Sequence, residues 1–215
     1  KFVSPVSGDG EDALKEAANW VAKTLEQSPQ DRVFAVVHAR GGHPPWTVSP
    51  KQLEVLPPAD YAGDINPRRA GQQVATLRRG KNRMVADDAD TLRLRALADV
   101  GLTEQDRLLG ELIDVVASSV PRDRSLIVVT GDTTSAYSNL YADILPLEEQ
   151  HLALPLYVVF PDKTYAQKRV FIPTDATDIA PTIRAAMGLP QPEDAMGRDL
   201  GQIASELAIA ASDPL

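Results

Sequence analysis

The sequence contains no cysteine, which excludes disulfide bonds, thiolate zinc sites and cysteine nucleophiles within its 215 residues. Positive charge is also scarce, because 22 lysines and arginines face 30 acidic residues and leave a formal net charge of −8. A nucleic-acid-binding surface is normally basic, so we expect no nucleic-acid partner. No apolar run is long enough to span a membrane, and no signal peptide is visible. The chain begins with Lys1 rather than Met, so we expect it to be a piece of a longer protein.

Hydrophobic residues make up 43% of the chain, which is enough for a substantial core. Short apolar runs predict strands over 33–38, 125–132, 154–160 and 169–172, each bounded by turn residues. Helical spacing predicts helices that end near Gln27, run from 92 to 116 and from 179 to 187, and cover 201–211. We expect Asp9 or Asp12 to cap the first helix, and Thr177 or Asp178 to cap the third. Strands that alternate with helices favour an α/β fold with a mixed, mostly parallel sheet flanked by helices.

We treat residues 1–215 as a single region that contains an irregular stretch over 41–88. Six prolines interrupt that stretch, and its arginines and lysine make it locally basic. Long irregular stretches in compact chains are either functional or disordered. The basic residues have a plainer interpretation as a solvated surface.

Two predicted strands lead to side chains that could carry chemistry. His43 follows the first strand across a Gly-Gly turn, and Asp132 ends the second. In a parallel sheet both would lie at the carboxyl edge, where open α/β sheets bind ligands. One histidine and one carboxylate do not make a site, since calcium alone takes about six to eight oxygens. No Gly-x-Ser-x-Gly elbow, phosphate-binding loop or dinucleotide fingerprint is present.

The order of the segments resembles the second half of the sulfatases, in the alkaline-phosphatase-like superfamily. The family's "PHxPY" stands here as Gly42-His43-Pro44-Pro45-Trp46, and its "TSDHG" as Thr130-Gly131-Asp132-Thr133-Thr134. The family's "DLAPT" stands as Asp178-Ile179-Ala180-Pro181-Thr182, and its closing "GxSL" as Gly197-Arg198-Asp199-Leu200. A further block over 96–110 resembles the family's helix, with Ala98 in place of its tyrosine.

The resemblance implies a sulfatase-like hydrolase of sulfate or phosphate esters. His43 falls on the histidine that contacts the substrate, and Asp132 and Thr133 fall on metal ligands, with Ca²⁺ as the expected cation. The paired metal aspartates and the formylglycine nucleophile are expected upstream of Lys1. The implied partners are therefore a small-molecule or glycan sulfate ester and a complementary N-terminal fragment or subunit. The compartment is not determined by the sequence, although the resemblance favours a periplasmic or extracellular location.

The departures from the family pattern leave a second interpretation open. Thr133 stands where the family has His or Asn, and a threonine hydroxyl is a poorer ligand than either. Residues 135–153 contain no lysine or arginine, although a lysine in this region usually contacts the sulfate. The alternative is a catalytically inactive pseudoenzyme that retains the fold as a binding or scaffold module. Thr133 also argues against phosphoryl-transfer relatives, which typically have Asp-His at this pair.

Overall fold

The computed structural model describes residues 10–39, 46, 48–70, 72–73, 87–131, 153–161 and 172–210. The chain divides into two compact units. The first unit comprises residues 1–119 and 133–153, and the second comprises residues 120–132 and 154–215. None of the helices in the described ranges combines the length and apolar character that crossing a membrane requires.

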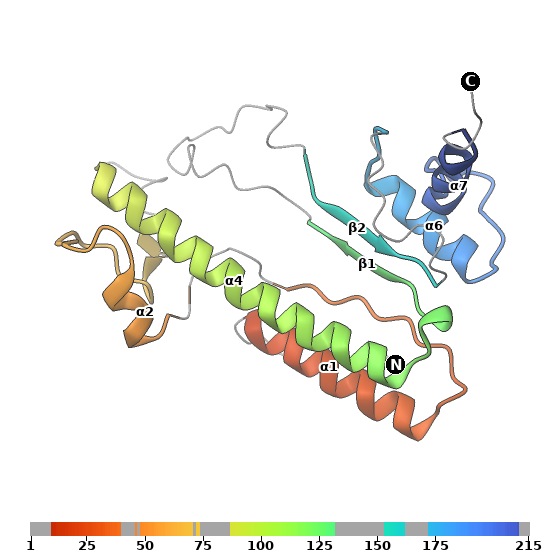
Figure 1. Ribbon diagram of the computed structural model, residues 1–215, viewed down its shortest axis with the longest axis horizontal. Helices are drawn as coiled ribbons and strands as arrows, with labels where there is room; N and C mark the ends of the chain where they lie inside the picture. Colours follow the sequence, from red (N-terminus) through yellow and green to blue (C-terminus); the bar gives the residue numbers. More distant parts are fainter. Residues whose placement is uncertain are drawn as a thin grey trace. The chain divides into compact units, whose positions relative to one another are not determined.

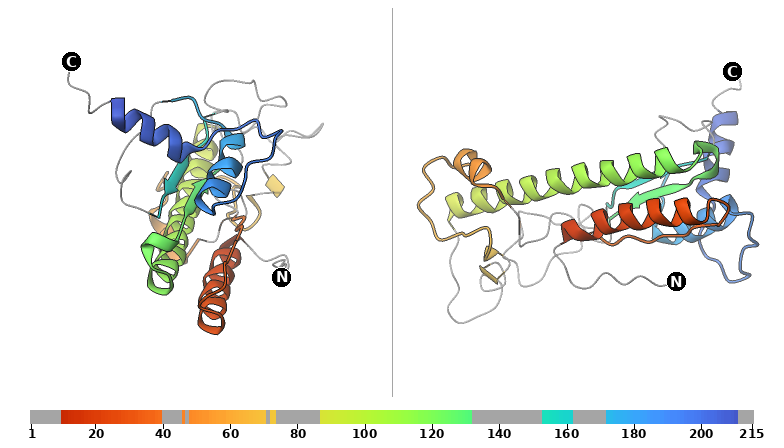
Figure 2. Two further views of the ribbon diagram at one scale, coloured as in Figure 1. Left: turned by 90° about the vertical axis from the view of Figure 1, so that its right-hand side faces the viewer. Right: turned by 90° about the horizontal axis from the view of Figure 1, so that it is seen from below.

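Two long helices form the frame of the first unit. Helix α1 spans Gly10–Gln27 and helix α4 spans Asp88–Ser119, and they lie side by side and run in the same direction (Figures 1 and 2). Leu14 and Val21 of α1 are buried, as is Leu108 of α4, so each helix turns an apolar stripe inward. Both helices were predicted from their periodicity and are confirmed. Helix α4 ends just before Pro121, which disfavours helical conformation in the residue that precedes it.

The first half of α4 is covered by part of the segment predicted to be irregular. Helix α2, Pro50–Val55 (Figure 1), begins with a capping box in which the Ser49 side chain accepts from the backbone N–H of Gln52. Further along, the chain buries apolar side chains against α4. The resulting core contains Trp46, Leu56, Ile65, Ala70, Leu94, Ala96, Leu97 and Ala98. The described residues between 46 and 70 therefore build a small hydrophobic core together with the first half of α4.

The predicted strand over 33–38 is wrong for the structure as described. Residues 32–39 belong to no helix or strand, and the side chains of Phe34 and Val36 are 61% and 80% exposed. The apolar run was interpreted as a buried strand, but burial needs neighbouring strands that the sequence run itself does not supply. In the described part of the chain no such neighbour pairs with it.

The second unit contains strands β1, Ile127–Thr130, and β2, Leu156–Val159, which follow the short 3-10 turn η1, Arg122–Arg124. The two strands pair antiparallel, with Ile127 opposite Val159 and Thr130 opposite Leu156. Both lie within predicted strands, and both are shorter than predicted. They form the one sheet within the described ranges, so the mostly parallel sheet stays a prediction. Residues 169–171 of the fourth predicted strand lie outside the described residues, and Ile172 is not in a strand.

Helices α6, Ile179–Ala186, and α7, Leu200–Ala210, complete the second unit, preceded by the 3-10 turn η3, Ala176–Asp178. Helix α6 stops as predicted at Gly188, whose φ of 67° lies in the left-handed region that glycine adopts without strain. The N–H of Leu189 then donates to the carbonyl of Arg184 at 2.8 Å, which closes the end of the helix. Helix α7 agrees with the predicted helix over 201–211, beginning one residue earlier.

Candidate functional site

The three residues predicted for the site, His43, Asp132 and Thr133, lie outside the described residues. The structure does describe the elements that lead to them. Strand β1 ends two residues before Asp132, and Trp46 follows His43 by three residues. The structure therefore describes residues that lie close in sequence to each predicted site residue.

The carboxyl end of β1 is tied to the residue before β2. The hydroxyl of Thr130 lies 3.0 Å from the carbonyl oxygen of Pro155 and 3.2 Å from that of Gly131. Thr130 also pairs with Leu156 in the sheet. The residue is therefore held both by its side-chain hydrogen bond and by strand pairing. The backbone is held in this way up to Gly131, next to the predicted metal ligand.

On the other side, Trp46 is buried in the core of the first unit, with 6% of its surface exposed. Its ring lies against Gly101 of α4, where an ideal Cβ would be 2.5 Å from Cδ1 of the ring. Any other residue at position 101 would place its Cβ in the space that the Trp46 ring occupies. The chain is anchored at this point, three residues beyond the predicted substrate-binding histidine.

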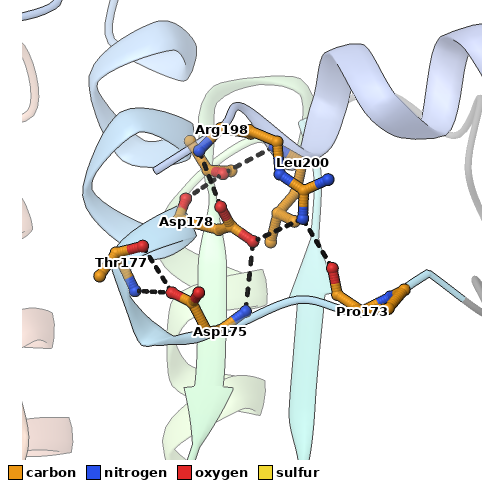
Figure 3. A network of polar contacts seen from close by, with 7 residues as sticks. Pro173, Asp175, Thr177, Asp178, Arg198 and Leu200 are labelled. Atoms are coloured by element: carbon orange, nitrogen blue, oxygen red, sulfur yellow. Dashed lines mark hydrogen bonds and ion pairs between the residues drawn. The ribbon is translucent and has the colours of Figure 1, made fainter. Parts of the chain in front are cut away.

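The residues of the "DLAPT" and "GxSL" blocks form a polar network in the second unit (Figure 3). The Asp178 side chain is 2% exposed, and its carboxylate accepts from the backbone N–H of Arg198 at 2.7 Å and of Asp175 at 3.2 Å. The Arg198 guanidinium approaches the same carboxylate at 3.4 Å and donates to the carbonyl of Pro173 at 2.6 Å. The Thr182 hydroxyl accepts from the N–H of Leu200 at 2.9 Å. The network joins the start of α6 to the start of α7.

The prediction that Thr177 or Asp178 caps helix α6 is confirmed in position, because Asp178 is the N-cap residue of α6. Asp178 makes no side-chain capping bond, however, and the side-chain cap belongs to turn η3, where the Asp175 carboxylate accepts from the N–H of Thr177 at 2.7 Å. Hydrogen bonds from the Thr177 hydroxyl and backbone lower the pKa of Asp175. The inserted turn η3 moves the side-chain cap three residues upstream, which frees Asp178 to bind the closing block. The pattern of an acid before an apolar helix does not reveal such a turn.

A second polar cluster lies in the first unit where α4 begins. The Tyr61 hydroxyl donates to Asp90 at 2.5 Å and accepts from the N–H of Ile65 at 2.8 Å. Burial and the hydrogen bond to Asp90 raise the pKa of Tyr61 to about 12. The Arg93 guanidinium lies 5.2 Å from the centre of the Tyr61 ring and donates to the carbonyl of Leu56 at 2.9 Å. This cluster was not predicted from the sequence, although Asp87 and Asp90 at the helix start were a signal of an N-terminal cap.

In the part of the chain that the structure describes, no group of three or more His, Asp or Glu side chains could hold a metal ion. The donors that the sequence offers are the Asp132 carboxylate, which suits a hard divalent cation, and the Thr133 hydroxyl, which suits it poorly. A complete metal site is therefore not found among the described residues.

Comparison with families of known proteins relates most of these segments to one another. The family model "Sulfatase" matches residues 5–189 of the 215 residues. The chain belongs to the sulfatase family. Searches of curated proteins and of solved structures gave no match. Membership in the family confirms the resemblance of the chain to the sulfatases and the broad class of an alkaline-phosphatase-like α/β fold. Sulfatases act on sulfate esters and generally use a divalent metal.

The matched range covers the three predicted site residues and much of the described structure. The matched range includes His43, Asp132 and Thr133, although their roles stay predictions. The closing block at 197–200 lies beyond the match, yet Arg198 and Leu200 bond to residues inside it. The family's helix block over 96–110 falls within α4, where Ala98 is fully buried beside Leu97. The sequence departure at Ala98 thus lies in the core of the first unit.

Proposed function

We propose that this chain is the part of a sulfatase-like hydrolase that holds a sulfate or phosphate ester through His43 and contributes Asp132 to a divalent metal site. The reaction class is hydrolysis of an ester to an alcohol and an inorganic anion. The chain contains no cysteine, so it offers no precursor for a cysteine-derived formylglycine nucleophile. We therefore do not expect these 215 residues alone to turn over substrate.

The observation that carries this proposal is the family match over 5–189, which includes both proposed site residues. Two structural features support it. Strand β1 runs to Thr130, directly before Gly131 and Asp132, as expected for a carboxylate delivered by a strand end. Trp46 is anchored in the core close to His43 in sequence.

The chemistry of the two side chains suits these roles. A protonated imidazole donates hydrogen bonds to a sulfate oxygen and can give its proton to the departing alkoxide oxygen as the ester bond breaks. The Asp132 carboxylate is the type of ligand that a hard divalent cation prefers. Such a cation, when bound, would neutralise charge on the anionic ester.

A second function, that of a non-catalytic binding or scaffold module, is favoured by one specific observation. Thr133 replaces the family's His or Asn, and residues 135–153 contain no lysine or arginine to contact the sulfate. A site with fewer ligands and fewer positive charges would still bind anions through His43, but with less stabilisation of the transition state. Both functions share the fold and differ in metal binding.

The proposal is tested by titrating the full chain with inorganic sulfate while following the histidine ring resonances by NMR. The chain has three histidines, and His43→Gln identifies the resonances of His43. We expect sulfate to shift the His43 resonances, with affinity that increases as the pH falls through about 6.5, because the imidazolium binds the anion.

His38→Gln is the matched control, because it removes a neighbouring histidine and should leave the sulfate titration of His43 unchanged. If sulfate leaves the His43 resonances in place at every pH, the substrate-binding role of His43 is wrong. If sulfate binds but Asp132→Asn leaves calcium binding of the Thr133→Asn chain unchanged, Asp132 is not a metal ligand and the non-catalytic function is the correct one.

A further inference from the structure

Residues 33–39 form an apolar stretch that pairs with no strand in the described structure. The seven residues include no glycine or proline and no acidic residue, lysine or arginine. Valine and phenylalanine, which dominate the stretch, are among the residues most common in strands. The stretch follows α1 without a turn and belongs to no helix or strand (Figure 1). An uncharged segment of this length and composition is a template for pairing with another strand.

The two faces of the stretch differ in exposure. Phe34 is 61% exposed and Val36 is 80% exposed, whereas Val33 and Val37 are half-buried. Residues two apart in an extended chain lie on the same face, so Phe34 and Val36 share one face of the stretch. That face therefore presents two neighbouring large apolar side chains to solvent.

The order of these residues makes the stretch complementary to itself. Two copies that pair antiparallel with Ala35 opposite Ala35 place Phe34 of each copy opposite Val36 of the other. In the same register Val33 lies opposite Val37 on the other face. Pairs of an aromatic and a β-branched side chain stabilise neighbouring strands when they lie directly opposite each other. A second copy of the stretch thus supplies a partner for both exposed side chains.

The charges beside the stretch favour this antiparallel arrangement. Parallel pairing in register would place Asp31 opposite Asp31 and Arg32 opposite Arg32, and like charges directly opposite each other destabilise a strand pair. Antiparallel pairing about Ala35 instead places Asp31 opposite Ala39 and Arg32 opposite His38, which avoids both like-charged pairs. A contact without lysine, arginine or acidic residues also suits a chain of net charge −8, whose copies repel each other elsewhere.

We infer that residues 33–37 are a self-association strand, through which two copies of this chain pair antiparallel about Ala35. The contact is isologous, because the same residues meet from both copies around a two-fold axis. One pair of short strands buries far less than the roughly 1,600 Å² of a standard stable interface. The dimer is therefore weak, with an expected dissociation constant of about 100 µM. This inference does not depend on the proposed function of His43 and Asp132.

Sedimentation velocity of the full chain tests the association. We expect monomers at about 10 µM and mostly dimers at about 1 mM. Val36→Lys places a charge within the contact and should raise the dissociation constant by about tenfold or more. Val55→Lys is the matched control, because Val55 of α2 is 79% exposed and makes the same change outside the stretch. This control should associate as the unaltered chain does.

The absence of cysteine from the chain allows the register to be tested by cross-linking. With Ala35→Cys the two thiols lie directly opposite, at a Cα separation of about 4.5–5.5 Å that a disulfide can bridge. Arg32→Cys is the control, since Arg32 is exposed but its counterpart in the other copy lies six residues further along, about 20 Å away. With oxidised glutathione as the oxidant, we expect covalent dimers from Ala35→Cys and few from Arg32→Cys.

Each measurement has an outcome that overturns part of the inference. A chain that stays monomeric at about 1 mM has no self-association strand, and a dimer that Val36→Lys leaves intact is formed elsewhere. Equal losses in Val36→Lys and Val55→Lys would show that added charge alone prevents association. Equal cross-linking of Ala35→Cys and Arg32→Cys would exclude the antiparallel register. The cross-linking result decides the question if Val36→Lys fails to fold.

Discussion

At the scale of single residues, charged side chains in the described part of the molecule lie in two kinds of environment, exposed and buried. Arg107 lies on the surface of α4 between Glu104 and Glu111, with about half of its side chain exposed, and pairs with both. Asp178 is 2% exposed and depends on two backbone N–H groups and a guanidinium. Exposed ion pairs contribute little to stability, whereas a buried carboxylate and its donors are costly to separate. The two residues should therefore respond very differently to mutation.

We expect Asp178→Ala to destabilise the second unit by about 2–4 kcal/mol, because it leaves the N–H groups of Asp175 and Arg198 without their acceptor. Arg198→Ala should cost only about 1 kcal/mol, since its side chain is half exposed and its backbone N–H remains bonded. Chemical denaturation measures both changes. Arg107→Ala, which removes only exposed pairs, should change the free energy of unfolding by less than about 0.5 kcal/mol. Equal effects for Asp178→Ala and Arg107→Ala would contradict the structural role of the network.

The Tyr61 hydroxyl gives the first unit a dependence on alkaline pH. Its pKa is raised to about 12 from an ordinary value of about 10, so the folded state favours the protonated form. The stabilisation is fully present below pH 10 and is lost as the pH rises from about 10 to about 12. We expect Tyr61→Phe to remove this part of the pH dependence, which denaturation at a series of alkaline pH values would reveal. A variant whose stability declines over the same range as the unaltered chain would show that Tyr61 is not the group responsible.

At the scale of helices and strands, two positions of the second unit require glycine for different physical reasons, one for lack of space and the other for a positive φ. An ideal Cβ at Gly197 would lie 2.0 Å from the carbonyl oxygen of Thr177, whereas Gly188 has open space but a φ of 67°. Gly197→Ala should therefore destabilise the second unit by about 3 kcal/mol, because the backbone atoms of η3 cannot move away from the added methyl group without disrupting the turn. Gly188→Ala should cost about 1 kcal/mol, the penalty of a side chain at positive φ. Thermal and chemical unfolding of the two variants give the comparison, and a milder effect at Gly197 than at Gly188 would contradict it.

Among these elements, the helices could be predicted from the sequence, whereas the strand pairing could not. Helices α1, α4, α6 and α7 follow from apolar periodicity and from local stop signals such as Gly188 and Pro121, which depend on nearby residues alone. Strand positions depend on partners far away in the chain, so the run over 33–38 has strand composition without being a strand in the described structure. The antiparallel pairing of β1 with β2 and the cap at Asp175 were not predicted either, because neither leaves a distinctive local pattern.

At the scale of the whole molecule, the family could be recognised from ordered blocks, while the site itself could not be assembled from them. His43 and Asp132 were identified by their place in the motifs, and their mutual geometry lies outside the described residues. The anchors beside them, Trp46 on Gly101 and Thr130 on Pro155, could not be found by motif comparison. Each depends on a contact between segments separated by 25 residues or more, and such contacts are not encoded by local spacing.

Cation binding by the whole chain tests how far this member of the sulfatase family departs from the family pattern. Calcium needs about six to eight oxygen ligands, and Asp132 with the neutral Thr133 supplies few of them. We expect calorimetric titration of the 215-residue chain to show no micromolar calcium binding. Thr133→Asn restores an amide oxygen and should tighten binding measurably, whereas Thr103→Asn, at an exposed position of α4, should not. Micromolar binding by the unaltered chain would mean that Thr133 does not weaken the site. Identical binding by the two asparagine variants would mean that Thr133 does not occupy the position of a metal ligand, because an amide at a ligand position is a stronger donor than the hydroxyl it replaces.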